Sequence, residues 1–444
     1  METPIWDFLQ AYDRSGTARF HMPGHKGVDF LGCEHLDLTE IDGADSLYEA
    51  DGIIARSEAN AAALFGSGRT VYSTEGSSQC IRAMLYLALN NRPMGTPPVI
   101  VAARNVHKAF VYAAALLDFH VVWLWPDGGN RSLCSCPISP ETLENTLKHL
   151  PDPPAAVYLT SPDYLGNTAD IAGLSEVAHR YGTMLLVDNA HGAYLHFLQP
   201  SLHPLDQGAD LCCDSAHKTL PVLTGGAYLH FSASTPSSFW AQAKGAMALF
   251  GSTSPSYLTM ASLDRCNAYL SGDYPRRLET TVREVEQVRS VLRENGWQVE
   301  HTDPLRLTIT LRGTESGTDL AHRLRQYKME CEYADPDSLV LMITPENNHE
   351  DFHRLITALG KNTGPSVKKD VLPLARGEQV LPIRQALFAP HEVIPADRSL
   401  GRICGAPTVS CPPAIPIAVS GEKIGPAAVR IFDYYGVEKV DVVK

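Results

Sequence analysis

The sequence contains no apolar run approaching the ~20 residues that a membrane-spanning helix needs, although 44% of its 444 residues are hydrophobic. Its opening residues, METPIWDFLQAYDR, also lack the basic stretch and the apolar stretch of a secretory signal. We therefore expect a cytoplasmic protein without a membrane partner. The length allows about two or three domains, each with a sizeable core.

Positive charge is in short supply, because 37 lysines and arginines stand against 50 aspartates and glutamates, giving a net charge of −13. Proteins that bind nucleic acids regardless of sequence neutralise phosphates with clustered basic residues. The composition therefore argues against a nucleic-acid partner, and it leaves a local basic pocket open.

No C-x-x-C motif occurs among the 10 cysteines, and in a long chain without a secretory signal we expect reduced thiols. Cys134 and Cys136 could bind a metal, but no second pair of ligands completes such a site. His21 and His25 have the spacing of a zinc hydrolase. A proline between them disfavours the helix that would align them, and H-E-x-x-H is missing. We assign no metal site.

Short apolar runs alternate with helix-like segments through the middle of the chain. This alternation, with nearly continuous hydrophobicity in the runs, predicts an α/β fold whose mainly parallel sheet is covered on both faces. The expected strands are Pro98–Ala103, Val121–Trp125, Ala155–Thr160, Met184–Val187 and Ala227–Phe231, and the expected helices are Ser77–Leu89, Lys108–Leu117, Pro140–Leu150 and Ile171–Tyr181.

The pattern of apolar and charged residues changes near residue 275. A charged amphipathic helix is expected at Arg276–Asn295, followed by strands at Arg306–Thr310 and Ser338–Ile343. Residues 362–380 have the composition of a polar connector, and the tail is rich in proline. We therefore predict an arm (1–55), a large α/β domain (56–275) and a smaller α/β C-terminal domain (276–444).

Two segments suggest carbonyl chemistry. Lys218 follows a short apolar run in ADLCCDSAHKTLP, and a shielded lysine there could form an imine with an aldehyde cofactor. Asp188 ends the apolar run TMLLVD, at the strand end where open α/β sheets place ligands. Its carboxylate could pair with a pyridinium nitrogen. Taken singly, the lysine could equally be a solvated surface charge, and the aspartate could cap a helix or bind a metal.

Two further segments complete the set. Gly76, Ser77 and Ser78 precede a strong helix pattern and could cradle a phosphate, although they could equally be a simple helix cap. His107 follows another strand and could stack on a planar ring, or be an ordinary surface or core histidine. All four segments lie at expected strand ends, and their combination indicates pyridoxal 5'-phosphate.

With these residues in hand, the chain resembles the Orn/Lys/Arg decarboxylase family of pyridoxal-phosphate enzymes. The resemblance runs from Phe20 to about Ile424. The matching motifs are FHMPGHKG, DLTEIDGADSLYEADGII, FGSGRTVYSTEGSS, RNVHKA, SPDYLGNTADI, VDNAHGAYLHF, DSAHKTLPVLTGGAYLH, STSPSYLTMASLD and GRICGAPTVSCPPAIPIAVSGEKI. It implies the aspartate-aminotransferase fold (fold type I) in a short form that lacks the N-terminal domain of the large inducible members.

The resemblance also implies residue roles. Lys218 would hold the cofactor covalently, Asp188 would pair with the pyridine nitrogen, and His107 would stack on the ring. Thr253 would reach the phosphate of a neighbouring subunit, which implies a homodimer or higher homo-oligomer with its active site at the subunit interface. The other residues implied to bind the cofactor are Gly76, Ser77, Ser78, His191, Ser215 and His217.

The chain departs from the family pattern at four positions. Asn189 replaces an acidic residue, Tyr194 replaces a histidine, Gly225 replaces a glutamine, and Ser420 replaces a proline. Because Lys218 is retained, these departures bear on the substrate rather than on the cofactor.

The implied activity is α-decarboxylation of arginine, lysine or ornithine, which releases CO₂ and a di- or polyamine. Glu422, and less directly Asp45, are candidates for receiving the distal cationic group of the substrate. Sequence spacing leaves two alternatives open: transamination or oxidation with the same cofactor, and a silent decarboxylase-like protein that regulates an active relative.

Overall fold

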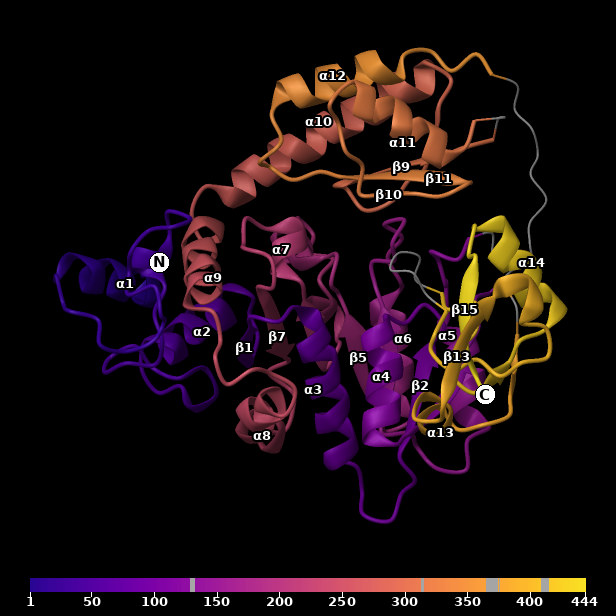
Figure 1. Ribbon diagram of the computed structural model, residues 1–444, viewed down its shortest axis with the longest axis horizontal. Coiled ribbons are helices and arrows are strands. Elements are labelled where there is room, and N and C mark those ends of the chain that lie inside the picture. The colour runs from indigo at the N-terminus through magenta and orange to yellow at the C-terminus, as the bar shows by residue number, and fades with distance from the viewer. Residues whose placement is uncertain (128–131, 313–314, 365–373, 375, 409–414) are drawn as a thin grey trace. The chain divides into compact units, whose positions relative to one another are not determined.

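The computed structural model describes residues 1–127, 132–312, 315–364, 374, 376–408 and 415–444. The chain forms two compact units (Figure 1). Unit 1 comprises Met1–Thr96, Ala155–Tyr158 and Ile171–Arg277, and unit 2 comprises Pro97–Pro154, Leu159–Asp170 and Leu278–Lys444. The division into residues 1–55, 56–275 and 276–444 stays a prediction.

Four strands of unit 1 lie in the order β1 (Arg69–Ser73), β7 (Ala227–Phe231), β6 (Leu211–Asp214) and β5 (Met184–Asp188). β5 and β6 run parallel, whereas β7 is antiparallel to both of its neighbours. Every residue of β6 and β7 is buried, which explains the lack of polar alternation in most of these strands.

The helices of unit 1 begin where the strands end. α3 follows β1 after a short turn, and α7 follows β6 directly, so both helices start at the edge where their strands finish. The helical segments of this unit are α1 (Pro4–Arg14), η1 (Glu34–Leu36), η2 (Leu47–Glu49), α2 (Ile53–Leu64), α3 (Ser77–Asn90), α6 (Ile171–Arg180), η3 (Ala193–Phe197), η4 (Pro204–Gln207), α7 (Ala216–Thr219), α8 (Ser237–Ala248) and α9 (Tyr257–Leu270).

The predicted arm carries one long helix, α1, which is tied to α9. The backbone N–H groups of Ile5 and Trp6 both donate to Oδ2 of Asp264 at 3.0 Å. A carboxylate at this helix end satisfies donors that lack an intrahelical partner and complements the helix dipole. The segment after α1 exposes large apolar side chains, with Phe20 96% exposed and Leu31 88% exposed.

Unit 2 begins with the parallel pair β2 (Val99–Ala103) and β3 (His120–Leu124), joined through α4 (Lys108–Leu117) and followed by α5 (Pro140–Lys148). A four-stranded antiparallel sheet has the order β10 (Tyr333–Ala334), β11 (Ser338–Met342), β9 (Arg306–Thr310) and β8 (Gln298–Val299). Figure 1 shows α10 (Tyr274–Glu294), α11 (Gly317–Gln326) and α12 (His349–Leu359) on one face of this sheet.

The C-terminal part of unit 2 contains two small antiparallel pairs. β12 (Glu378–Gln379) pairs with β14 (Glu422–Lys423), and β13 (His391–Pro395) pairs with β15 (Lys439–Val443). The accompanying helical segments are α13 (Ile383–Leu387), η5 (Ala396–Arg398) and α14 (Pro426–Tyr434). Parts of the predicted polar connector and of the Pro-rich tail lie outside the described residues.

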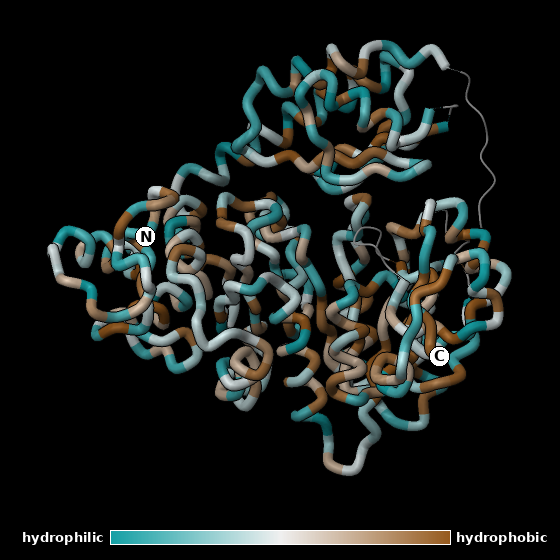
Figure 2. The backbone as a smooth tube through the Cα atoms, viewed as in Figure 1, coloured by the Kyte–Doolittle hydropathy of each residue, from teal (hydrophilic) through white to brown (hydrophobic). Residues whose placement is uncertain are grey.

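One strand, β4 (Ala156–Thr160), contributes residues to both units. The large sheet has seven strands in the order β1-β7-β6-β5-β4-β2-β3. The predicted strands agree with the structure to within one residue at each end, and the predicted helices to within two. Figure 2 shows apolar and polar residues alternating along the helices, as expected of helices with one buried face. Among the described helices, none is both long and apolar enough to cross a membrane.

Candidate active site

Asp188 lies at the carboxyl end of β5, and only 2% of it is exposed. The Tyr158 hydroxyl donates to its Oδ2 at 3.2 Å, and the backbone N–H of Ala190 donates to its Oδ1 at 3.1 Å. Burial raises the pKa of the Asp188 carboxyl, and the charge of Lys218 together with these hydrogen bonds offsets only part of that effect. A buried carboxylate of this kind favours a cationic partner.

Lys218 is carried by α7, the short helical turn that follows β6. Its Nζ lies 2.9 Å from Nε2 of His191, a buried residue in the loop after β5. The structure therefore brings together two predicted residues that are 27 positions apart. Lys218 also acts electrostatically on Asp188, so the lysine, the histidine and the aspartate form one group in unit 1.

The predicted phosphate cradle sits at the first turn of α3. Gly76 is the N-cap, with a φ of 71° that a residue bearing a side chain adopts only with strain. The Ser215 hydroxyl donates to the Ser77 hydroxyl at 2.8 Å, across 138 positions of sequence. Free N–H groups of a helix start, with hydroxyls beside them, suit an anion such as a phosphate.

His217 faces the same turn. Its Cε1 would lie 3.9 Å from a Cβ placed on Gly76, and its Nδ1 lies 3.0 Å from the carbonyl oxygen of Gly226. That carbonyl can only accept, so Nδ1 carries the proton in this contact. Burial lowers the pKa of His217. Gly76, Ser77, Ser215 and His217 therefore meet in unit 1, with Ser78 next in the same helical turn.

Two predicted residues belong to other segments of the chain. His107, in unit 2, is the N-cap of α4, and its Nδ1 accepts from the backbone N–H of Ala109 at 3.2 Å. Thr253 lies in an exposed segment between α8 and α9. The ring-stacking role of His107 and the inter-subunit role of Thr253 stay predictions.

Glu422 and Asp45 have other partners than a substrate. Both oxygens of Glu422 accept from the guanidinium of Arg104, at 2.8 and 2.7 Å, and only 2% of Glu422 is exposed. Asp45 accepts backbone N–H groups at the start of α2, including that of Gly52 at 2.8 Å. Burial acts to raise the pKa of Asp45, but these hydrogen bonds outweigh it and lower the pKa. Both carboxylates therefore have structural partners, and their role in receiving the substrate stays a prediction.

Two neighbours of Asp188 and one of Asn189 were missed from the sequence. Tyr158 lies within β4, and Cys213 stands beside Asp188 in the β5–β6 register, with its Sγ 3.8 Å from Oδ1. Asp214, the last residue of β6, accepts from the side-chain amide of Asn189 at 2.7 Å. The parallel pairing of two strand ends is the signal that would have identified Cys213 and Asp214.

The structure shows the surroundings of the four residues that depart from the family pattern. Asn189 is fully buried and bonded to Asp214, and Tyr194 is 1% exposed. Gly225 has a φ of 98°, and a Cβ there would lie 2.5 Å from the carbonyl oxygen of Thr74. The chain therefore requires glycine at this position. Ser420 is fully buried.

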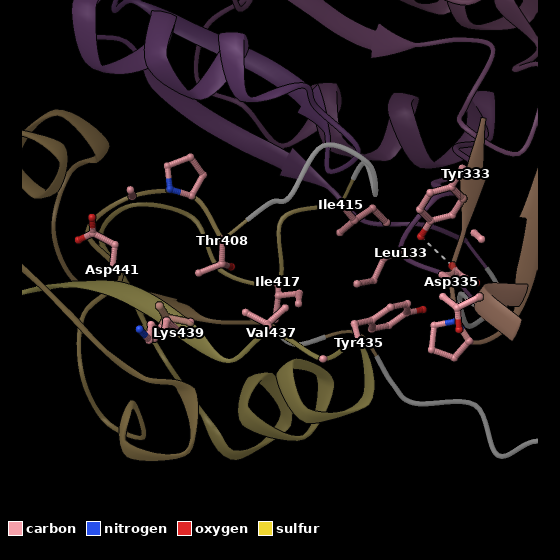
Figure 3. Close-up of a pocket in the computed structure, with 17 residues that line it drawn as sticks. Leu133, Tyr333, Asp335, Thr408, Ile415, Ile417, Tyr435, Val437, Lys439 and Asp441 are labelled. Carbon is pink, nitrogen blue, oxygen red and sulfur yellow. Dashed lines mark hydrogen bonds between the residues drawn. The ribbon is translucent and has the colours of Figure 1, made fainter. Parts of the chain in front are cut away.

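Unit 2 also contains a cavity of about 550 Å³, within the range of small-molecule pockets. Figure 3 shows Tyr333 and Asp335 at one end of its lining and Asp441 at the other. The Tyr333 hydroxyl donates to Oδ2 of Asp335 at 2.8 Å. None of the predicted catalytic or cofactor-binding residues is among the described residues that line this cavity.

The sheet topology, with a lysine turn after one strand and a buried aspartate at the end of its neighbour, defines the class: the fold is that of the fold type I pyridoxal-phosphate enzymes. Among solved structures, a lysine decarboxylase from Francisella novicida, LdcF, is similar over 100% of this chain and 81% of its own, with a TM-score of 0.82 at 17% identity. Serine palmitoyltransferase with PLP is similar over 79% of this chain and 82% of its own, with a TM-score of 0.57 at 14% identity.

Residues 3–353 match the family described as Orn/Lys/Arg decarboxylase, major domain. The chain therefore belongs to the Orn/Lys/Arg decarboxylase family. Arginine decarboxylase of Bacillus subtilis (strain 168) is 29% identical over 456 residues, which cover 95% of this chain and 91% of the relative. The expected family and fold class are both confirmed.

Proposed function

We propose that this protein is a pyridoxal-phosphate-dependent α-decarboxylase of a basic amino acid, releasing CO₂ and a di- or polyamine in the cytoplasm. The observation that carries the proposal is the Lys218–His191 contact of 2.9 Å beside the buried Asp188. The turn of Gly76, Ser77 and Ser78 adds a phosphate cradle in the same unit. Arginine, lysine and ornithine are the candidate substrates, and the arginine decarboxylase relative makes arginine the first to test.

The described residues fit the cofactor. A buried carboxylate suits a pyridinium nitrogen, a helix start with hydroxyls suits a phosphate, and a half-buried lysine suits an aldehyde. Pyridoxal phosphate, when bound, supplies an electron sink for the pair released from the broken Cα bond. Asp188 would keep the ring nitrogen protonated, and Tyr158 and Ala190 would hold that carboxylate in place.

Lys218 and His191 would transfer protons to and from the substrate. When Lys218 is not bound to the cofactor, its protonated amine, within reach of His191, would supply the proton that returns to Cα. His217 would hold the phosphate through its Nε2, because its Nδ1 faces the carbonyl of Gly226. These residues would orient the substrate and place charge, which are large contributions to catalysis.

We further propose that the active enzyme is a homodimer or a higher homo-oligomer. The segment after α1 exposes Phe20, Met22, Phe30 and Leu31 to between 66% and 96%. Large apolar side chains exposed in a short segment are typical of a protein–protein interface. Thr253 is exposed as well, as the predicted contact with a neighbouring subunit requires.

The test incubates the purified holoprotein with carboxyl-labelled arginine, lysine and ornithine in turn. Released CO₂ and the mass of the amine product are measured, with keto acids assayed alongside. We expect CO₂ and amine in equal amounts from one of the three. A keto acid without CO₂ would favour transamination, and bound cofactor without turnover would favour the silent regulator.

The variant Lys218→Ala tests the attachment point. Borohydride reduction followed by peptide mapping is expected to place the cofactor on Lys218 in the wild type and to give no labelled peptide in the variant. The matched control is Lys148→Ala, because Lys148 is an exposed lysine in the last turn of α5. Label on any other residue of the wild type would overturn the assignment.

A further inference from the structure

A second group of metal-ligating side chains lies in unit 1. His203, Asp214 and His230 are each fully buried. One ligand atom from each residue lies within 4.8 Å of those of the other two. None of the three belongs to the predicted catalytic or cofactor-binding set, and the group goes beyond the proposed decarboxylase function.

Strand pairing builds this group. Cys212 and Asp214 are two residues apart on β6, so their side chains point to the same face of the sheet. In the antiparallel register, His230 of β7 stands opposite Cys212. His203 comes from the loop that precedes η4. Three potential ligands from three separate segments therefore converge, which is why no spacing motif revealed them.

The distances resemble those of a tetrahedral metal site. Oδ2 of Asp214 lies 3.1 Å from Nε2 of His203 and 3.3 Å from Nε2 of His230. Metal–ligand bonds near 2.1 Å in a tetrahedron place nitrogen and oxygen ligands about 3.4 Å apart. The Sγ of Cys212 lies 3.9 Å from Nε2 of His203, but Cys212 is not part of the group of mutually close ligand atoms.

Surrounding hydrogen bonds already orient the ligands. The Asn189 amide donates to Oδ1 of Asp214 at 2.7 Å, which leaves Oδ2 directed at the two imidazoles. Nδ1 of His230 lies 2.8 Å from the Thr70 hydroxyl, and when Nδ1 donates to that hydroxyl, Nε2 is unprotonated and free to bind a metal. Metal-binding histidines and carboxylates are usually held by a second layer of hydrogen bonds of this kind.

Hydrogen bonding alone does not account for the group. Nε2 of His230 is buried and makes no hydrogen bond to any described residue, although it lies 3.3 Å from Asp214. Among the described residues, the ion-pair partners of Asp214 are the two histidines and no lysine or arginine. A buried carboxylate without a cation is costly. A divalent ion would supply that positive charge.

We propose that His203, Asp214 and His230 bind one divalent transition-metal ion. Two imidazole nitrogens and a carboxylate oxygen suit Zn²⁺, whereas Mg²⁺ and Ca²⁺ prefer oxygen ligands. The site is buried, and its role is structural: the ion links β6 and β7 to the loop that precedes η4.

The test measures zinc by mass spectrometry in the purified holoprotein, produced in zinc-supplemented medium and dialysed free of loose metal. We expect about one zinc ion per chain in the wild type, and roughly tenfold less or lower in Asp214→Asn and His230→Asn. Asp206→Asn is the matched control, because Asp206 belongs to a partly exposed neighbouring cluster with His196 and His203. It is expected to retain the ion.

Three outcomes would overturn the proposal: a wild-type chain without zinc, equal zinc in Asp214→Asn, or zinc lost in Asp206→Asn alone. If Asp214→Asn and His230→Asn fail to fold by circular dichroism, the cobalt-substituted wild type decides. Tetrahedral Co²⁺ absorbs at roughly 500–700 nm, outside the absorption of pyridoxal phosphate. A cobalt-treated wild-type chain without these bands would overturn the proposed site.

Discussion

The substitution Glu422→Gln tests whether this carboxylate supports the fold or binds substrate. Glu422 accepts two hydrogen bonds from the buried guanidinium of Arg104, and a third from the backbone N–H of Val419 at 2.9 Å. The guanidinium lies 4.8 Å from the ring centroids of both Trp123 and Trp125. Arg104 is fully buried, so nearly all of its charge compensation comes from one carboxylate.

The cost follows from the loss of that charge. A glutamine at position 422 can accept one hydrogen bond, but its amide group presents a donor where the second guanidinium donor needs an acceptor. Removing one partner of a buried ion pair costs about 3–5 kcal/mol, because an uncompensated charge stays inside the protein. The adjacent indole rings return a part of this, on the order of 1–2 kcal/mol. We therefore expect the free energy of unfolding to fall by about 2–4 kcal/mol.

Urea unfolding followed by tryptophan fluorescence measures this change. Glu392→Gln is the matched control, because Glu392 accepts from Arg402 at 2.7 Å in an exposed ion pair, where a loss of at most about 1 kcal/mol is expected. The KM for the amino acid is measured on the same samples. Unchanged stability of Glu422→Gln together with a tenfold or greater rise in KM would refute the structural role and restore substrate binding.

Three further outcomes are expected. Burial raises the pKa of Asp188 in the folded, cofactor-free chain. The contribution of this group to stability is therefore greatest below its unfolded pKa of about 4, and it is lost as the pH rises through the folded pKa. The urea midpoint of Asp188→Asn should therefore rise relative to that of the wild type between pH 4 and pH 7. A difference between the two midpoints that stays constant with pH would contradict this. In the holoprotein, Asp188→Asn should lower kcat by roughly 100-fold or more while retaining cofactor by absorbance, because an amide does not hold the pyridinium proton; an unchanged kcat would exclude the role. Gly225→Gln should lower the thermal midpoint through at least about 1 kcal/mol of strain, whereas Gly245→Ala, which meets open space in α8, should raise it slightly; equal midpoints for the two variants would contradict the steric argument.

Much of the fold and of the candidate active site could be predicted because the sequence patterns that indicate them are local. A buried strand has a run of apolar residues in the sequence, and the polar residue that ends the run marks the ligand-binding edge of the sheet. Asp188 and Lys218 each follow such a run, and the glycine and serines at positions 76–78 precede an amphipathic helix. These patterns need no knowledge of which strands pair.

The remainder depends on contacts between distant segments. Arg104 and Glu422 are 318 positions apart, and neither is distinguished by its neighbours in the sequence, so Glu422 looked like an acid available to substrate. The carboxylate of Asp45 accepts five backbone hydrogen bonds, and this role was hidden for a different reason. It depends on a left-handed residue at position 45 itself, with a φ of 73°, and on the turn that follows.

Successive side chains of β6 belong to two different proposed sites, the cofactor site and the metal site. Cys213 faces Asp188, whereas Cys212 and Asp214 face the two buried histidines. A strand directs successive side chains to opposite faces, so the proposed cofactor side and the proposed metal side share a backbone but no ligand. The asparagine at position 189 joins them, because it follows Asp188 directly and donates to Asp214. The family's acidic residue at that position would place a second carboxylate against Asp214, and like charges in a buried pair repel. Asparagine removes that repulsion, and its amide supplies Asp214 with a hydrogen-bond donor instead.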